Sequence, residues 1–255
     1  MNIVVPIKQI PSLVDELELN GDGTGLDEDS LTFVINEFDE HAVEQAALIK
    51  EAGGGTVTVV GINNTEEIEG SLHAALAKGA DKVASIACEY APELSSHAQA
   101  KMFAEAIKGM SADLVLTGVQ AANDRDGNLG PMLAAHLGMP YVGVVAGLSV
   151  SGSTATITKE YSGGIVAQFE VALPAVVGVQ AASQPPRYAP ISKIRQMAKE
   201  STVEELEVEG EDESAGSSVA RMYPPESAGH AEMLGDDAGE VVEKIYAILS
   251  ERGLV

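Results

Sequence analysis

The residues best suited to hold a ligand lie between Gly118 and Leu129. The segment reads Gly118-Val119-Gln120-Ala121-Ala122-Asn123-Asp124-Arg125-Asp126-Gly127-Asn128-Leu129. It connects a predicted strand over 113–118 to a predicted helix over 129–137. A glycine at the end of a strand lets the backbone approach a ligand closely, and the free N–H groups at the start of a helix favour a phosphate. The segment matches neither the GxGxxG nor the P-loop pattern, so it indicates either a nucleotide site or a polar turn with capping Asn and Asp residues.

Two other loops are expected beside this segment. Pro6-Ile7-Lys8-Gln9 closes the first predicted strand, and Gly61-Ile62-Asn63-Asn64 follows the second. The carboxyl ends of parallel strands meet at one edge of a sheet, where α/β proteins bind their ligands. Three loops that converge there favour a small-molecule site more strongly than any one of them does.

The sequence contains no recognisable catalytic grouping. His41, His73, His97, His136 and His230 are scattered, without an HxH or HExxH spacing that would predict a metal site. No serine lies in a GxSxG motif. The single cysteine, Cys88, excludes an internal disulfide and a CxxC site, and we expect it to be inert. This absence of a catalytic grouping favours a carrier over a hydrolase or a transferase, so we do not expect an enzyme.

The elements that must position these loops alternate between strand and helix over the first 140 residues. This alternation predicts an α/β fold with a parallel sheet, helices on both faces and right-handed crossovers. Asn36, with Asp39 three residues later, is expected to cap a helix that runs to about Ala52. The pattern then changes to closely spaced strands, which predict an antiparallel extension: 142–150, 155–161, 166–172 and 175–179.

The last part of the chain differs from the rest. Residues 201–255 contain 14 acidic and 3 basic residues, and 204–229 lack a helical or strand period. We therefore divide the chain into a domain over 1–200 and an acidic C-terminal arm over 201–255. A helical apolar stripe returns over 238–251. This helix is expected to pack either against another chain or on its own domain.

Composition limits the classes of partner. Thirty-nine acidic residues against 15 basic ones give a formal charge of −24, which repels nucleic acid and anionic lipid surfaces. The acidity fits either a salty cytoplasm or a docking surface for basic partners. The first residues do not read as a signal peptide, and no apolar run is long enough to span a membrane. These features predict a cytoplasmic protein.

Seven short motifs, in their order and spacing, resemble the beta subunit family of electron transfer flavoproteins. The resemblance covers nearly the whole chain. Its motifs are Val5-Pro6-Ile7-Lys8-Gln9, Asn36-Glu37-Phe38-Asp39-Glu40 with Ala42-Val43-Glu44, Ala75-Leu76-Ala77-Lys78-Gly79-Ala80-Asp81, Asp113-Leu114-Val115-Leu116-Thr117-Gly118, Gln120-Ala121, Leu173-Pro174-Ala175-Val176-Val177 and Pro186-Arg187-Tyr188.

The resemblance implies a Rossmann-like, adenine-nucleotide-binding fold that forms a heterodimer with an alpha subunit. The alpha subunit would make most contacts to the electron-carrying FAD. The chain itself would hold an AMP, or a second FAD in electron-bifurcating members. Carried over by position, the nucleotide-contacting residues are Pro6, Asn36, Glu37, Phe38, Asp39, Gly61, Ile62 and the whole segment from Gly118 to Leu129.

The resemblance also implies a partner-recognition loop over about 184–199. Ile191 matches an apolar anchor for flavoprotein dehydrogenases; the alternative is a core contact in a short helix. Where family members often carry a lysine-rich run, this chain reads Arg195-Gln196-Met197-Ala198-Lys199-Glu200. This departure argues against electrostatic steering of the partner, or implies partners with another charge pattern.

Two departures from the family motifs bear on which nucleotide the chain holds. The phosphate loop keeps Gly130-Pro131 but lacks the Thr-Ala-Gln run that is typical of bifurcating members, and this favours AMP over a second FAD. The Asn, Thr and Gly-Gln pattern of the AMP type is not matched cleanly either.

The resemblance thus predicts an electron-carrier subunit that passes electrons from flavoprotein dehydrogenases through FAD to a quinone oxidoreductase. Two alternatives are a bifurcating complex with a second FAD and a stand-alone nucleotide-binding sensor.

Overall fold

The fold is built on a central strand that is apolar on both of its faces. β1 (Asn2–Ile7) is buried from Ile3 to its end, as expected for an unbroken apolar run inside a parallel sheet. Ile3 and Val5 pack into one core cluster and Val4 into another, because successive side chains of a strand point to opposite faces. The computed structural model describes all residues except 66, 89–93, 125, 209–218, 226–228 and 230.

Seven strands form the central sheet, and every pair in it is parallel. Their spatial order is β12 (Glu204–Leu206), β5 (Lys82–Ile86), β4 (Thr56–Ile62), β1, β6 (Leu114–Gly118), β11 (Ala175–Val179) and β7 (Tyr141–Val145). The chain first moves outward from β1 through β4 to β5, and then returns to place β6 on the other side of β1. The boundary between β1 and β6 is therefore the topological switch point of the sheet.

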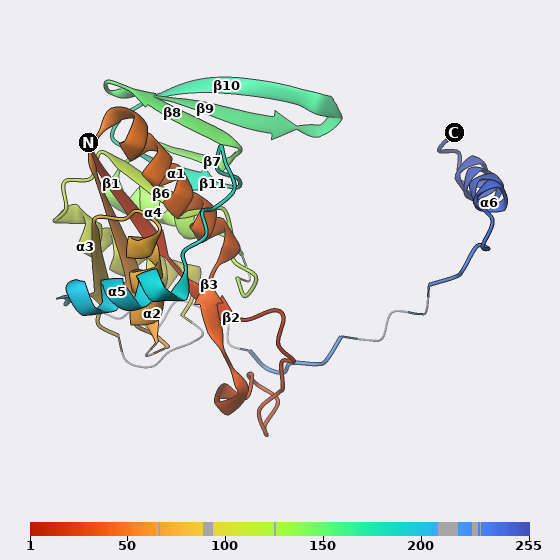
Figure 1. Ribbon diagram of the computed structural model, residues 1–255, viewed down its shortest axis with the longest axis horizontal. Coiled ribbons are helices and arrows are strands. Elements are labelled where there is room, and N and C mark those ends of the chain that lie inside the picture. Colours follow the sequence, from red (N-terminus) through yellow and green to blue (C-terminus); the bar gives the residue numbers. More distant parts are fainter. Residues whose placement is uncertain (66, 89–93, 125, 209–218, 226–228, 230) are drawn as a thin grey trace.

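Four helices cover the two faces of this sheet. α1 (Glu37–Gly53) and α2 (Ile68–Ala77) share a core cluster with one face, and α3 (Ser96–Lys108) and α4 (Leu129–Leu137) share a cluster with the other. Figure 1 shows α1 and α2 in front of the sheet. The three-layer α/β architecture predicted from the sequence is confirmed.

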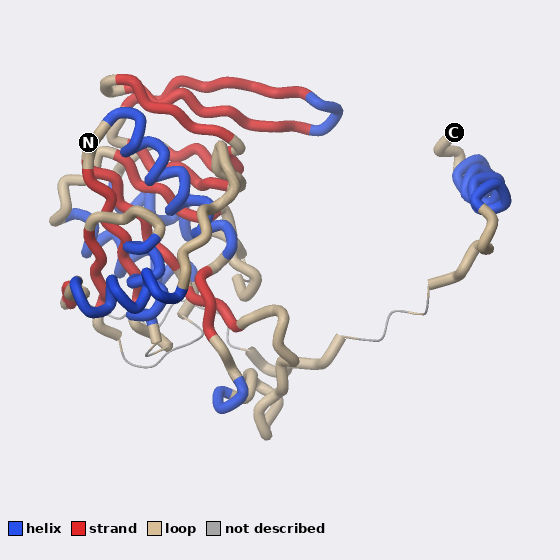
Figure 2. The backbone as a smooth tube through the Cα atoms, viewed as in Figure 1, coloured by secondary structure: helices blue, strands red, loops and turns tan. Residues whose placement is uncertain are grey.

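A small antiparallel sheet extends the molecule at one end. It consists of β8 (Gly147–Ser151), β9 (Thr154–Tyr161) and β10 (Ile165–Ala172), with the short helix η2 (Ser162–Gly164) at its tip. Figure 2 shows that its far end projects past the rest of the body. The predicted antiparallel extension is thus present.

The structure corrects two of the strands expected in this extension. The apolar stretch 142–150 is not one strand but is divided between β7 and β8, and the strand over 175–179 is β11, which is parallel and lies between β6 and β7. A register shift accompanies the division, and Val144 in it has a φ of 59°. Alternating apolar residues look the same in both kinds of sheet, so their period does not separate parallel from antiparallel pairing.

A long excursion separates β1 from α1. β2 (Gln9–Pro11) and β3 (Phe33–Ile35) pair as an antiparallel ladder. The loop between them contains the short helix η1 (Glu28–Ser30) and an isolated bridge between Leu19 and Leu26.

The C-terminal part contributes one strand to the body and then leaves it. α5 (Ile191–Glu200) packs on α2, and β12, from the segment assigned to the arm, adds an edge strand beside β5. α6 (Ala238–Glu251) stands apart from the body in Figure 1, and none of its residues is buried. In the described part of the chain, no helix has the length and apolar composition that a membrane span requires.

Candidate functional site

The switch point contains a gap in the strand ladder. β1 pairs with β4 as far as Ile7, but its pairing with β6 covers only Ile3 and Val4. Pro6 has no N–H group to donate to a ladder, and the pairing with β6 ends before it. The two strands therefore part at their carboxyl ends, so the backbone N–H groups of Lys8 and Gly118 need other acceptors.

Asp39 occupies this gap and fastens both strand ends to the first turn of α1. One of its carboxylate oxygens accepts a hydrogen bond from the Lys8 N–H at 2.8 Å, and the other accepts one from the Gly118 N–H at 2.8 Å. The side chain is buried. Burial raises the pKa of Asp39 to about 7, against the opposing effect of these two hydrogen bonds.

Asn36 also has a tertiary role in place of the expected capping role. Within the described residues, its side chain makes no capping hydrogen bond at the start of α1. Its Nδ2 atom instead donates to the Gln120 carbonyl at 2.8 Å. The prediction that Asn36 and Asp39 cap the helix is wrong in its chemistry, although α1 begins where it was expected. Both side chains instead tie α1 to the loop after β6.

The two strand-end glycines are required by packing between elements. A Cβ atom on Gly118 would overlap a carboxylate oxygen of Asp39 and lie 2.9 Å from the Phe38 carbonyl carbon. A Cβ on Gly61 would lie 2.5 Å from Ile68 Cγ1 in α2. Both glycines therefore let a neighbouring helix approach the end of a strand closely.

A buried ion pair joins the loops on the two sides of the gap. Lys8 pairs with Asp124, and their side chains are only 11% and 7% exposed. Asp124 also accepts a hydrogen bond from the Ala121 N–H at 2.8 Å. Lys8 was not among the predicted site residues, although a cation at the end of the first strand was the available signal for it.

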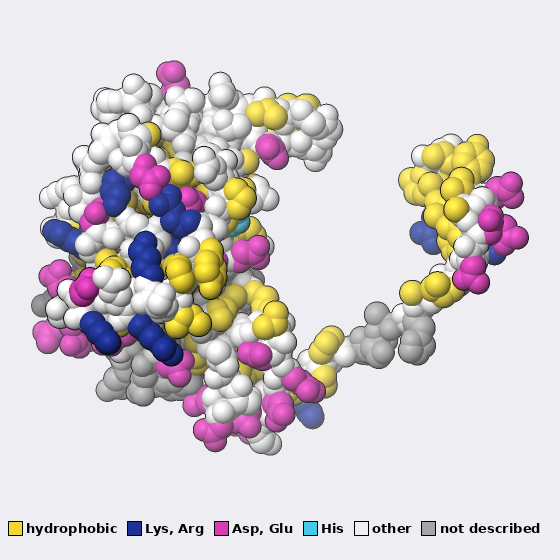
Figure 3. Space-filling model, in the orientation of Figure 1, with side chains coloured by type: hydrophobic (Ala, Val, Ile, Leu, Met, Phe, Trp, Pro, Cys, Tyr) yellow, Lys and Arg dark blue, Asp and Glu magenta, His cyan; other side chains and the backbone are white. Residues whose placement is uncertain are grey.

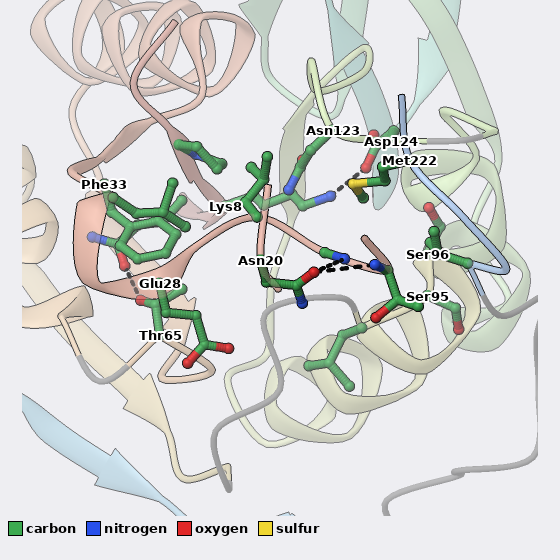
Figure 4. A pocket seen from close by; sticks show the side chains of 18 of the residues that line it. Lys8, Asn20, Glu28, Phe33, Thr65, Ser95, Ser96, Asn123, Asp124 and Met222 are labelled. Atoms are coloured by element: carbon green, nitrogen blue, oxygen red, sulfur yellow. Dashed lines mark hydrogen bonds and ion pairs between the residues drawn. The ribbon is translucent and has the colours of Figure 1, made fainter. Parts of the chain in front are cut away.

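A cavity of about 520 Å³ opens at this edge of the sheet, within the range of small-molecule sites. Figure 4 shows its surroundings. The loops after β1 and β6 contribute Lys8, Asn123, Asp124 and Asp126 to its wall. Gln9 and Pro11 of β2 and Thr65 after β4 also line it. The rest comes from segments that sequence reasoning missed: the excursion over 20–33, the start of α3 and residues of the C-terminal arm.

The remaining predicted site residues differ in burial. Several are buried: Pro6, Asn36, Asp39, Gly61, Ile62, Gly118 and Ala121. Others are partly or fully exposed: Glu37, Phe38, Val119, Gln120, Ala122, Gly127, Asn128 and Leu129. Arg125 lies outside the described residues. Of the predicted set, Asn123, Asp124 and Asp126 are the members that line the cavity.

This edge of the sheet contains a buried acceptor that the described residues leave unsatisfied. Asn63, directly after β4, has a buried Oδ1 atom without a hydrogen-bond partner among the described residues. An exocyclic amino group of a base is the kind of donor that satisfies such an oxygen. Lys8 is already paired with a carboxylate. In the loop after β6, the N–H groups of Ala121, Asp124 and Asn128 already donate to protein acceptors, so a phosphate there would depend on other N–H groups of the loop. No group of three or more His, Cys, Asp and Glu in the described ranges is suited to a metal ion.

The predicted partner anchor lies away from this cavity. Ile191 is the first residue of α5 and is 63% exposed, so it is not a core contact. Tyr188, just before it, is 84% exposed. Figure 3 shows Lys and Arg side chains gathered on the face that carries α5, and Lys193, Arg195 and Lys199 of this helix are exposed.

Comparison with known proteins connects this architecture to one family. The family model of the electron transfer flavoprotein domain matches residues 24–211. The beta subunit of the electron transfer flavoprotein of Methylophilus methylotrophus is 32% identical over 261 residues, which covers 98% of both chains. The beta subunit of Bacillus subtilis is 28% identical over the full length of both chains. That of Dictyostelium discoideum is 26% identical over 100% of this chain and 99% of its own.

Proposed function

This chain belongs to the electron transfer flavoprotein family as a beta subunit, and from that premise we propose that it is the nucleotide-holding half of a heterodimer that carries electrons on FAD. A general role in electron transfer follows from the family. The cofactors, the route of the electrons and the partners are parts of the proposal. The stand-alone sensor is set aside, because the similarity to beta subunits extends over the whole chain.

The observation that carries the nucleotide site is the cavity at the switch point. Its wall includes Lys8, Asn123 and Asp124 from the two loops that flank the gap. Asp39 and Asn36 hold these loops in register from behind, through the hydrogen bonds to Lys8, Gly118 and Gln120. We assign an adenine nucleotide to this cavity, where Asn123, Asp124 and Asp126 of the segment from Gly118 to Leu129 form part of the wall.

The protein in this proposal positions cofactors and does not react with them. FAD supplies the redox chemistry when it is bound, and the protein fixes its place and surroundings. Electrons would come from flavoprotein dehydrogenases that dock at Ile191, and would leave to a quinone oxidoreductase. The exposure of Ile191 and Tyr188 beside the basic side chains of α5 supports docking there.

One observation favours the second FAD over AMP. The cavity continues past the loops that the resemblance assigns to AMP and reaches Phe33, Leu94 and the start of α3. The additional space is partly apolar, as a larger cofactor with an extended ring system would require. AMP remains our first assignment, because the phosphate loop lacks the Thr-Ala-Gln run.

The experiment is a count of nucleotides. The chain is produced together with the alpha subunit of the same organism, and the complex is purified, denatured and analysed for released FAD and AMP. One FAD and one AMP per heterodimer support the carrier. Two FAD support the bifurcating complex. A complex in which this chain holds no nucleotide would refute the site.

A further inference from the structure

The C-terminal arm forms part of the wall of the cavity. Val219 and Met222 line it together with Asn123 and Asp124, and Figure 4 shows Met222 at the cavity, beside Asp124. The Met222 N–H donates a hydrogen bond to the Gly23 carbonyl at 2.7 Å. The arm thus crosses from the body to the excursion at the cavity, well before it reaches α6.

The partner of this hydrogen bond is a well-ordered turn. Asn20 Oδ1 accepts hydrogen bonds from the N–H groups of Thr24 at 3.1 Å and Gly25 at 3.2 Å. The Asn20 N–H in turn donates to the Gly25 carbonyl at 3.0 Å. These hydrogen bonds on both sides of Gly23 shape the turn that presents its carbonyl to Met222.

The local sequence of the arm turns one side chain toward the cavity. Arg221 and Tyr223 are exposed, whereas Met222 between them is half-buried. Arg221 lies over the Tyr223 ring, 5.2 Å from its centroid. Pro224 and Pro225 follow, and a proline favours an extended backbone in the residue before it. Of the three residues, Met222 alone lines the cavity, as expected where alternate side chains of an extended segment point to opposite sides.

We propose that residues 219–222 form a strap that closes the nucleotide cavity and slows the release of its ligand. The inference rests on the proposed function, because it takes an adenine nucleotide as the occupant. A nucleotide that leaves past the strap must first break the bond between Met222 and Gly23 and lift the Met222 side chain from the wall. The strap is distinct from α6, which begins at Ala238 and has no buried residue.

Two substitutions separate the contributions of the strap. Met222→Pro keeps the backbone extended but removes the donor to Gly23, and Met222→Ala removes the side chain from the wall. The matched controls are Met233→Pro and Met233→Ala, because Met233 lies in the same arm and is 82% exposed. Each full-length variant is purified with the alpha subunit and loaded with radiolabelled AMP. Release is followed after dilution into unlabelled AMP, and the same series is run with FAD.

Both Met222 variants should release the nucleotide roughly 10-fold faster than the wild type, the change expected for the loss of one hydrogen bond or one apolar contact. The Met233 variants should match the wild type. Wild-type release rates in the Met222 variants would overturn the strap and leave the nucleotide site intact. A wild-type complex that binds neither AMP nor FAD at this site would overturn the proposed function, and the strap with it.

A measurement on the wild type covers the case in which a variant does not fold. Amide hydrogen exchange at Met222 is compared in the complex with and without AMP. Slower exchange with AMP is expected, because a filled cavity holds the strap in place. The same exchange rate in both states would contradict the proposal.

Discussion

At the scale of single residues, Asp39 holds together three elements of the nucleotide edge. Its carboxylate accepts hydrogen bonds from the backbone at the ends of β1 and β6, and its own backbone belongs to the first turn of α1. We expect Asp39→Asn to lower the free energy of unfolding by about 1–3 kcal/mol. The amide of Asn turns an N–H donor toward one of the two backbone N–H groups, whereas a carboxyl leaves both oxygens facing them. Urea unfolding measures this loss in the free energy of unfolding. Asp15→Asn, at an exposed position, is the control and should be neutral; equal effects of the two variants would contradict the role of Asp39.

The pKa of Asp39 predicts the direction of a pH effect. Burial raises this pKa from its ordinary value of 3.8 to about 7, so between these values the folded protein binds more protons than the unfolded chain. The stabilising contribution of the carboxyl is therefore complete below the unfolded-state pKa and is lost as the pH rises through the folded-state pKa. Asn does not titrate. The difference in free energy of unfolding between wild type and Asp39→Asn should shrink from about pH 4 to about pH 7, and a difference that stays constant or grows would refute the shift.

Gly118 gives a second prediction at the residue scale. Even the methyl group of Gly118→Ala would overlap Asp39, and bulkier residues would displace the start of α1 further. We expect a loss of about 1–3 kcal/mol in the free energy of unfolding and a lower nucleotide content of the purified complex. Gly70→Ala in α2 is the control, because a Cβ there meets no atom within 4 Å and alanine favours a helix. An unchanged nucleotide content in Gly118→Ala would argue against the site at this edge.

At the scale of elements, α5 has an exposed surface that does not pack into the core. Ile191 is 63% exposed at its start. Under the proposed function, Ile191→Ala should slow the reduction of the flavin by a dehydrogenase several-fold, without change in the flavin spectrum or in the free energy of unfolding. Stopped-flow mixing with the dehydrogenase measures the rate. Leu254→Ala, at a residue that is 67% exposed, should leave it unchanged. A normal rate in Ile191→Ala would remove the anchor assignment.

At the scale of the whole molecule, α6 is an amphipathic helix held away from the body. Val242, Ile245 and Tyr246 are exposed on it, and Figure 3 shows hydrophobic side chains gathered on one side of the helix. We propose that the alpha subunit covers this side. Ile245→Asp should weaken the heterodimer at least 10-fold, because a charge would be buried in an apolar contact. Ala247→Asp adds the same charge on the opposite side and should leave assembly intact. Sedimentation at graded concentrations measures the dissociation constant of the heterodimer for both variants. Equal dissociation constants would contradict the docking of α6 on the alpha subunit.

The sequence alone determined the elements and the edge at which a ligand is expected. Buried strands and amphipathic helices carry their signal in local apolar periods, so β1, α4 and α6 lie where these periods predict them. Loops at the carboxyl ends of parallel strands must meet, whatever their side chains, because the sheet topology brings them together. The family motifs could also be recognised from the sequence alone, because their order and spacing are properties of the sequence.

Only the tertiary structure decided what individual residues do at that edge. Asp39 reaches Gly118 across 79 positions of the chain, Asn36 reaches Gln120 across 84, and Lys8 reaches Asp124 across 116. No local period encodes such contacts, so Asn36 and Asp39 looked like helix caps, and the packing of Gly118 against Asp39 could not be foreseen. The parallel position of β11 and the contribution of the arm to the cavity were hidden for the same reason. Both depend on which distant segments pack together, and the free energy of packing depends on the whole folded chain.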